Sequence, residues 1–417
     1  MYEQSYWTTE AGLRLKDIYR SVSTLRLSLD RNPITKAAKG KARKRELQEL
    51  MLRDAATWHR MDGQFGGRWP RPRADLVLDI AMRTTLRDPA RIDKYCKWLL
   101  DDLGGTQGNP IVYADDRQVK MLFARLTRGT DNEEPSIWVT AQTVAQVRAG
   151  LRRVEDLDTR WTVGDANWEL DSHSHRDEEY HQGVSPEFLR AAGADAATIN
   201  EFALRDHVRR RLRDQLDSLA ITDQLSAAVV FAYADKRFCD SVGLPLTAEA
   251  LHRLLDYGLA VDLGPLPTQS GESAAFKQQT AKALIELLAR RPWMTPLLPS
   301  IGVTVFYLET GSGKDLDNIF GDLEVLPIVL DIVRPPGSPL ADYSPIEDLQ
   351  RWFEHDRIGS PATVGDIAFI EAVALKGTAD ERLSSGTVIV ALSHGERLES
   401  WWDNALGFLD DHNAQSD

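Results

Sequence analysis

The chain has 417 residues, of which 42% are hydrophobic and 27% are charged. These fractions are ordinary for a folded protein, and the length allows two or three domains. No apolar run approaches the ~20 residues that span a bilayer, and the first residues lack the layout of a signal peptide. Cys96 and Cys239 lie far apart in sequence. A cytoplasmic protein without a disulfide framework is therefore expected.

The net charge of −13 at first argues against nucleic acid as a partner. The charge is, however, unevenly distributed. Residues 1–155 carry 28 Lys and Arg against 20 Asp and Glu, a net charge of +8, and the remaining residues have a net charge of −21. The first part is thus expected to face a polyanion such as DNA. The acidic remainder could dock a basic protein partner.

In chain order, a short helix is expected at residues 9–19 and a strand at 25–29, where apolar residues alternate. The basic run over 36–45 leads into a helix that ends near residue 61. Apolar residues at helical spacing predict a helix over 92–103, which the following glycines end. Further strands are expected at 74–82, 111–113, 119–126 and 136–140.

The middle of the chain, residues 156–255, has too many apolar residues for a flexible linker. Helices are expected at 196–219 and 248–255, whereas the apolar run 224–233 fits either helix or strand. The last part ends with a strand at 387–392 and a closing helix. That helix carries Trp401, Trp402, Leu406 and Leu409, and its two tryptophans are expected to be core anchors rather than a binding surface.

Segments of the first part recur in the last part. Residues 25–33 resemble 259–267, and residues 46–55 resemble 280–289. Pro33 and Pro267 are 234 residues apart, as are Leu50 and Leu284. A repeat of this length indicates one domain duplicated and fused. We therefore expect an α+β protein with domains at 1–155, 156–255 and 256–417, the outer two packed face to face as an intramolecular pseudo-dimer around a helical middle region.

The repeated segments contain carboxylates suited to a hard metal ion. Asp315 and Asp317 are separated by one residue where a strand leads into a helix, and Asp366 begins a later strand. Three converging carboxylates repel one another, and Mg²⁺ or Mn²⁺ relieves that repulsion while binding phosphate oxygens. The alternative is an ordinary helix N-cap with an unrelated surface aspartate.

The order strand, Asp-x-Asp-Asn, helix, then Asp-Asp opening a strand resembles the RusA-like Holliday junction resolvases. The resemblance covers residues 22–150 and 259–392. It implies a Mg²⁺-dependent endonuclease of α+β fold that acts on branched DNA as a homodimer, so one chain with two copies could act as a monomer. In the last part the implied metal ligands are Asp315, Asp317 and Asp366, beside Asn318. In the first part the implied site residues are Asp93, Asp115, Asp116 and Lys97.

Each copy departs from this pattern. In the first, Arg91 occupies the leading aspartate position and Lys94 the asparagine position. In the second, Gly321 replaces the lysine and Gly365 the first acid of the Asp-Asp pair. These differences predict that the second copy holds the metal and that the first grips DNA. The DNA-binding residues would be Lys97 and the basic run Lys36, Lys39, Lys41, Arg43, Lys44 and Arg45. The alternative is that the basic run is only a solvated loop.

Two functions follow as hypotheses. The first is a metal-dependent endonuclease acting on branched or structured DNA. The second is a catalytically degenerate DNA-binding or scaffold subunit of a phage-related or defence assembly. Two further segments are open to more than one interpretation. The histidine-rich stretch 171–181 fits a metal site or an exposed loop, and the basic stretch 207–213 fits DNA contact or pairing with nearby acids.

Overall fold

The computed structural model describes most of the chain, including the backbone alone at 41–43, 57–64, 197–209, 212 and 273. The predicted helix at 9–19, the histidine-rich stretch 171–181 and the closing helix after Trp401 lie outside the described residues. The described ranges are 25–37, 41–64, 69, 73–104, 110–129, 133–149, 190–191, 193, 195–234, 247–267, 273–294, 297, 299–310, 316, 319, 328–329, 367–377, 379–395, 397 and 400–401.

The described helices and strands fall into three parts of the chain. The first part contains β1 (Leu25–Leu29), α3 (Lys41–Gln64), β2 (Leu76–Thr84), α4 (Ile92–Leu103), the 3-10 helix η1 (Asp116–Gln118), β3 (Val119–Arg128) and β4 (Ser136–Thr143). The middle contains α8 (Ala196–Ala234) and α10 (Thr247–Tyr257). The last part contains β5 (Ala260–Pro265), α11 (Ser273–Ala289), the 3-10 helix η3 (Pro292–Met294), β6 (Ile301–Glu309), β7 (Ile367–Lys376) and β8 (Thr387–His394).

The helix predicted at 92–103 and the strand predicted at 25–29 are confirmed to the residue. The strand predicted at 111–113 is wrong. The backbone N–H groups of Ile111 and Val112 both donate to the carbonyl oxygen of Leu103, so this segment closes the end of α4 instead of joining the sheet. The ambiguous run 224–233 belongs to α8.

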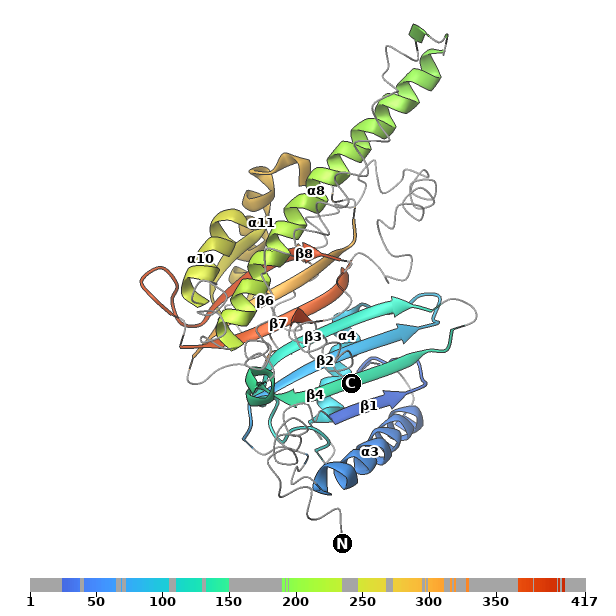
Figure 1. The fold of residues 1–417 in the computed structure, drawn as a ribbon, viewed down its shortest axis with the longest axis vertical. Helices are drawn as coiled ribbons and strands as arrows, with labels where there is room; N and C mark the ends of the chain where they lie inside the picture. The colour runs from blue at the N-terminus through green and yellow to red at the C-terminus, as the bar shows by residue number, and fades with distance from the viewer. Residues whose placement is uncertain are drawn as a thin grey trace, which may run out of the picture.

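All eight strands form one mixed sheet in the order β1-β4-β2-β3-β7-β6-β8-β5 (Figure 1). Each half of this order has an antiparallel outer pair, an antiparallel middle pair and a parallel inner pair. A register shift also recurs at the same place, between Leu76 and Val77 in β2 and between Ile301 and Gly302 in β6. The protein is therefore α+β with two halves of equal strand order. That either half is RusA-like stays a prediction.

The halves join edge to edge through the antiparallel pair β3 and β7. Phe123 lies opposite Glu371, and the register is symmetric about this pair, with Met121 opposite Val373 and Arg125 opposite Phe369. The expected face-to-face packing is therefore wrong, because backbone hydrogen bonds join the two halves into a continuous sheet. A pseudo-two-fold axis passes between Phe123 and Glu371.

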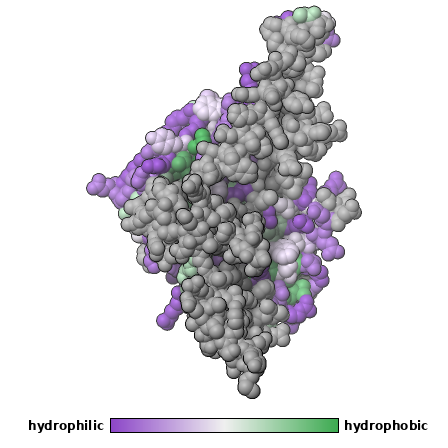
Figure 2. All heavy atoms as spheres, viewed as in Figure 1, coloured by the Kyte–Doolittle hydropathy of each residue, from purple (hydrophilic) through white to green (hydrophobic). Residues whose placement is uncertain are grey.

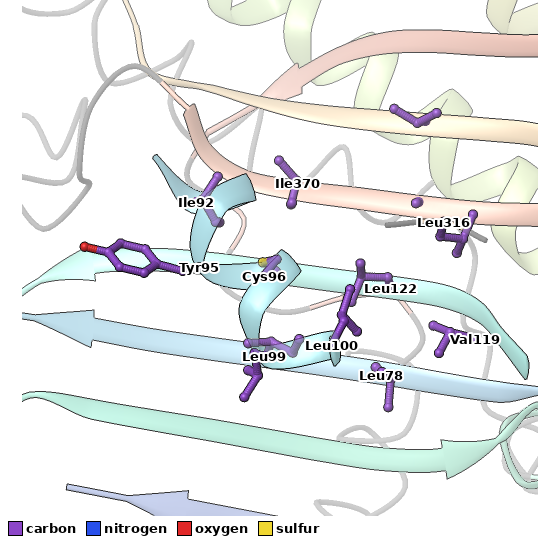
Figure 3. Packing of buried hydrophobic residues seen from close by; sticks show 14 of the residues in the cluster. Leu78, Ile92, Tyr95, Cys96, Leu99, Leu100, Val119, Leu122, Leu316 and Ile370 are labelled. Carbon is purple, nitrogen blue, oxygen red and sulfur yellow. The ribbon is translucent and has the colours of Figure 1, made fainter. Parts of the chain in front are cut away.

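One face of the sheet carries α3, α4 and α11 and buries a core that spans both halves. In Figure 3, Ile92 at the start of α4 lies beside Ile370 of β7, and Leu316 lies at the same junction between β3 and β7. The side chains of Ile92 and Leu316 are at most 3% exposed. Ile92 and Leu316 thus help to seal the joint between the halves.

On the opposite face, the helices that the structure describes cover mainly one half. The C-terminal part of α8 and α10 cover β5 to β8 and the beginnings of β2 and β3. In Figure 1 these helices cross in front of the last four strands, and neither of them lies in front of β1, β4 or the ends of β2 and β3. We call this region, which neither α8 nor α10 covers, the open face, and the side chains that alternate toward it are Arg26, Ser28, Asp79, Ala81, Arg83, Arg125, Thr127, Ser136, Trp138 and Thr140.

The middle helices are a layer of this fold. The 39 residues of α8 make a helix about 58 Å long, and its N-terminal part projects beyond the sheet (Figure 1). In the same view the described atoms that reach the surface are mainly hydrophilic (Figure 2). No helix in the described part of the chain is both long enough and apolar enough to cross a bilayer.

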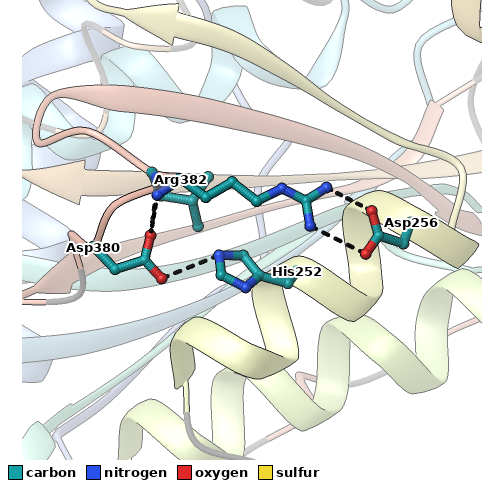
Figure 4. Close-up of polar contacts among 5 residues, drawn as sticks. His252, Asp256, Asp380 and Arg382 are labelled. Atoms are coloured by element: carbon teal, nitrogen blue, oxygen red, sulfur yellow. Dashed lines mark hydrogen bonds and ion pairs between the residues drawn. The ribbon is translucent and has the colours of Figure 1, made fainter.

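Exposed charges tie α10 to the turn between β7 and β8 (Figure 4). Arg382 donates to both carboxylate oxygens of Asp256, at 2.5 and 3.1 Å. Asp380 accepts from the backbone N–H groups of Arg382 and Leu383 and lies 3.1 Å from Nε2 of His252. These contacts hold the turn against α10 at the protein surface.

Candidate functional site

Asp93, a predicted metal ligand, is already paired with two cations. Its side chain is 2% exposed in the first turn of α4. Nε of Arg91 donates to Oδ1 at 3.0 Å and Nη2 to Oδ2 at 3.1 Å, while Nζ of Lys94 lies 3.3 Å from Oδ2. Burial alone would raise the pKa of Asp93, but the hydrogen bonds and charges of Arg91 and Lys94 outweigh it and lower the pKa. Both oxygens are therefore occupied, which does not fit a Mg²⁺ ligand.

Asp115 and Asp116 lie elsewhere. The carboxylate of Asp115 caps η1 by accepting from the backbone N–H of Arg117 at 3.0 Å, and Asp116 is exposed in η1. Both precede β3, whereas Asp93 follows Ile92, and Ile92 and Val119 lie at opposite ends of the packing in Figure 3. The structure does not bring Asp93 and Asp116 together. Among the described residues, no group of three His, Cys, Asp or Glu side chains could hold a metal ion.

Asp315, Asp317 and Asp366 of the last part lie outside the described residues, so their roles stay predictions. Their position in the repeat can still be compared through the strands. Val119 and Ile367 occupy equivalent positions, opposite Leu76 and Ile301. Asp366 directly precedes β7, and Gln118 directly precedes β3. By this strand alignment Asp366 is equivalent to Gln118, whereas the sequence pattern aligns it with Asp116, two positions earlier.

The basic run is partly used within the chain. Nζ of Lys36 lies 2.7 Å from Oδ2 of Asp101, and Nζ of Lys44 donates to the carbonyl oxygen of Lys36. Arg45 pairs with Glu49 one turn later in α3. Lys39 lies outside the described residues, and only the backbone of Lys41 and Arg43 is described. Lys97 is half-buried on α4, one turn after Asp93.

Asp102, beside this basic run, gives the chain a pH-dependent stability. Burial, partly offset by the indole of Trp98 and reinforced by Asp101, raises the pKa of Asp102 to about 6. The folded state therefore binds the proton more tightly than the unfolded state, whose carboxyl has a pKa near 3.8. Stability from this group is thus present below pH ~4 and is lost as the pH rises through ~6.

Replacing Asp102 with Asn is expected to raise the free energy of unfolding at pH 7 by on the order of 1–3 kcal/mol, because a buried charge is removed. Urea titrations between pH 4 and pH 7 would measure the effect. The matched control is Asp101→Asn, which removes the partly exposed partner of Lys36. A variant whose pH profile runs parallel to that of the unmodified protein would contradict the assignment.

The buried joint between the halves contains an ion pair. The guanidinium of Arg397 donates from Nη2 to Oε2 of Glu371 at 2.6 Å, and Oγ1 of Thr304 also donates to this oxygen at 3.2 Å. The guanidinium carbon lies 4.4 Å from the ring centre of Phe369 and 5.3 Å from that of Phe123. The side chain of Glu371 is wholly buried and that of Arg397 is 6% exposed. These groups hold both halves together and do not reach solvent.

Sequence reasoning missed the open face. In β1, in residues 136–141 of β4 and in the second half of β2, one set of alternating residues is buried and the other is partly or fully exposed. Trp138 in β4 is 54% exposed. The period-two pattern of Ser136–Thr143 already contains this signal, because Ser136, Trp138 and Thr140 alternate with Ile137, Val139 and Ala141.

No protein-family model matches the chain, and no curated protein or solved structure matches it. The RusA-like resemblance therefore rests on the sequence pattern of the two copies.

Proposed function

We propose that the protein is a metal-dependent endonuclease that acts on branched DNA. The first half would bind the DNA backbone, and the second half would hold the metal ion and cleave the DNA. Support comes from the excess of 28 basic over 20 acidic residues in positions 1–155. Further support comes from the equal strand order of the halves, since a pseudo-two-fold fold suits a symmetric branched substrate.

The observation that carries this division is the pairing of Arg91 with Asp93. Arg91 stands where the second copy has Asp315, and its guanidinium occupies both oxygens of Asp93. The first half therefore has a cation where the proposed catalytic half has a carboxylate. A basic side chain in that position suits contact with a phosphate and excludes a metal ion.

The proposed metal ligands are Asp315, Asp317 and Asp366, whose oxygens are the donors that Mg²⁺ and Mn²⁺ prefer. A bound ion would supply an activated water and neutralise charge on the scissile phosphate. The roles of this chain's cations are separate: Lys97 and the basic run would hold the DNA backbone, and such contacts recognise shape more than base sequence.

The second candidate is a catalytically degenerate DNA-binding or scaffold subunit. The neutralised Asp93 favours it, because one of the two copies cannot bind metal through this residue. The net charge of −21 over residues 156–417 also favours it, since an acidic surface attracts a basic protein partner.

A metal titration separates the two functions. Labelled four-way junction, fork and linear duplex would each be incubated with the protein in Mg²⁺, Mn²⁺ or EDTA. The nuclease proposal expects incision of the junction that requires metal. Retention of the junction without incision under every condition supports the second candidate instead, as does absence of binding to all three DNAs.

A further inference from the structure

Asp223 is a buried carboxyl group in the part of α8 that packs on the sheet. The residue is 8% exposed, and its Oδ2 accepts from the backbone N–H of His394, at the end of β8, at 3.0 Å. Its other oxygen, Oδ1, is buried and accepts no hydrogen bond from any described group. A buried carboxylate oxygen without a donor is costly when the group is ionised. The neutral form of Asp223 avoids this cost.

A second buried carboxyl, that of Glu371, already holds the nearby cation. Nη2 of Arg397 donates to Oε2 of Glu371 at 2.6 Å, whereas Asp223 receives no hydrogen bond from this guanidinium. The charge of Arg397 favours ionisation of Asp223, and the charge of Glu371 opposes it. With both carboxyls ionised, two negative charges and one positive charge would be buried together. The excess negative charge would fall on Asp223, because Glu371 has the direct ion pair.

The elements that pack against α8 offer Asp223 no other cation among the described residues. The acidic and basic side chains of α10 contact other groups: Glu249, His252, Arg253 and Asp256. The 3-10 helix η3 contains no ionisable side chain, and Arg291 before it donates to the carbonyl oxygen of Gly258.

On α8 itself the positions one turn from Asp223 are uncharged: Leu219, Ala220, Ser226 and Ala227. His394 adds a favourable charge to Asp223 only when its ring is protonated. Burial is accordingly the largest influence and raises the pKa of Asp223, although Arg397, His394 and the backbone N–H of His394 offset part of the rise.

We infer that Asp223 is a pH-sensitive switch: its neutral carboxyl keeps α8 docked on the sheet, and ionisation of that carboxyl loosens the helix. A carboxyl that is more basic in the folded state stabilises that state fully below its unfolded pKa of 3.8. This stabilisation is lost as the pH rises through the folded pKa. The switch acts on the middle helices, to which the proposed function assigns no role.

Hydrogen exchange of the α8 amides at residues 222–234 tests this switch in the full-length protein. Exchange would be measured by mass spectrometry from pH 5 to pH 8, with each rate corrected for the intrinsic pH dependence of amide exchange. Protection should fall as the pH rises, by at most about tenfold per pH unit, because one proton is released. Asp223→Asn should be protected equally at every pH, and more strongly than the unmodified protein at pH 8.

Two further variants serve as controls. Asp214→Asn removes an exposed carboxyl from an earlier turn of the same helix, so it should keep the pH dependence of the unmodified protein. Amides that exchange only through global unfolding would also report the titration of Asp102, whose pKa is about 6. The comparison is therefore repeated in the Asp102→Asn background, where the effect of Asp223→Asn should persist.

His394→Gln separates the two groups that could hold the proton. The variant keeps the backbone N–H that donates to Asp223 and removes the imidazole, so it should still lose protection as the pH rises. Loss of the pH dependence in His394→Gln would assign the proton to His394 and overturn the inference. Equal protection at pH 5 and pH 8 in the unmodified protein, or an unchanged pH dependence in Asp223→Asn, would overturn it as well. The first of these measurements needs no variant and so does not depend on whether Asp223→Asn folds.

Discussion

Asp317→Asn is expected to abolish metal-dependent cleavage of a four-way junction while leaving junction binding largely unchanged. The substitution keeps the size of the side chain and removes the charge that would hold the ion. Removing a residue that only hydrogen-bonds to a metal ligand typically lowers metal affinity or activity about 10–100-fold. Removing a ligand itself should therefore lower the cleavage rate by at least about 100-fold. Single-turnover cleavage with excess protein would measure the rate, and anisotropy would measure binding.

Asp93→Asn is the matched control for this experiment, because Asp93 occupies the corresponding position of the first copy. Arg91 and Lys94 neutralise Asp93 in the structure, so its amide variant should retain cleavage. In this variant the cations of Arg91 and Lys94 lose the carboxylate, but both side chains are partly exposed and can be hydrated, so the fold should be kept. Thermal unfolding would check this. Full activity in Asp317→Asn would show that the second copy does not cut, and loss only in Asp93→Asn would reverse the assignment.

Local sequence patterns predicted the elements whose packing they directly determine. The helix at 92–103 was predictable because Ile92, Tyr95, Leu99 and Leu103 recur on one face, and all four are buried. The repeat offset was also predictable. Thr140 and Ala391 occupy equivalent positions of β4 and β8, and they lie opposite Arg26 and Ala260, which are 234 residues apart. The offset agrees with that of Pro33 and Pro267.

The joint between the halves was not predictable in this way. Pairing of β3 with β7 joins residues about 250 positions apart, and no local pattern determines which strand edges meet. The covering of the faces was predictable in principle. Strands β6, β7 and β8 are nearly continuous apolar runs, as expected for strands buried on both faces, whereas β1 and β4 alternate. This contrast agrees with the described helices, which cover both faces of the half that contains β6, β7 and β8.

The candidate site was predicted less completely than the fold. The proposed match of the two copies places Arg91 at the position of Asp315, but only the folded chain shows two guanidinium nitrogens of Arg91 donating to Asp93. Likewise, the basic run is visible as charge, whereas the pairing of Lys36 with Asp101 depends on how α3 and α4 pack. Charge patterns indicate which groups could bind a partner, and tertiary contacts decide which of them are already neutralised.

Arg397→Met is expected to reduce the free energy of unfolding by about 3–5 kcal/mol, because it leaves the buried carboxylate of Glu371 without its cation. Glu371 is 0% exposed on the pseudo-two-fold axis, so solvent cannot replace the lost partner. The methionine keeps an apolar contact with the Phe123 and Phe369 rings that the guanidinium now covers. Urea unfolding at pH 7 would measure the change.

The sign of the pH dependence separates this effect from lost packing. Without Arg397, an ionised Glu371 carboxylate would be buried with no counter-charge from this side chain, and protonation would remove that cost. The variant should therefore regain stability as the pH falls from 7 toward 4.5, and Glu371→Gln combined with Arg397→Met should be more stable than Arg397→Met at pH 7. Arg382→Ala, which breaks the exposed pair with Asp256, is the matched control and should have a much smaller effect. The loss of unfolding free energy in Arg397→Met could instead be the same at every pH and persist in the double variant. That result would show that packing rather than charge compensation joins the two halves.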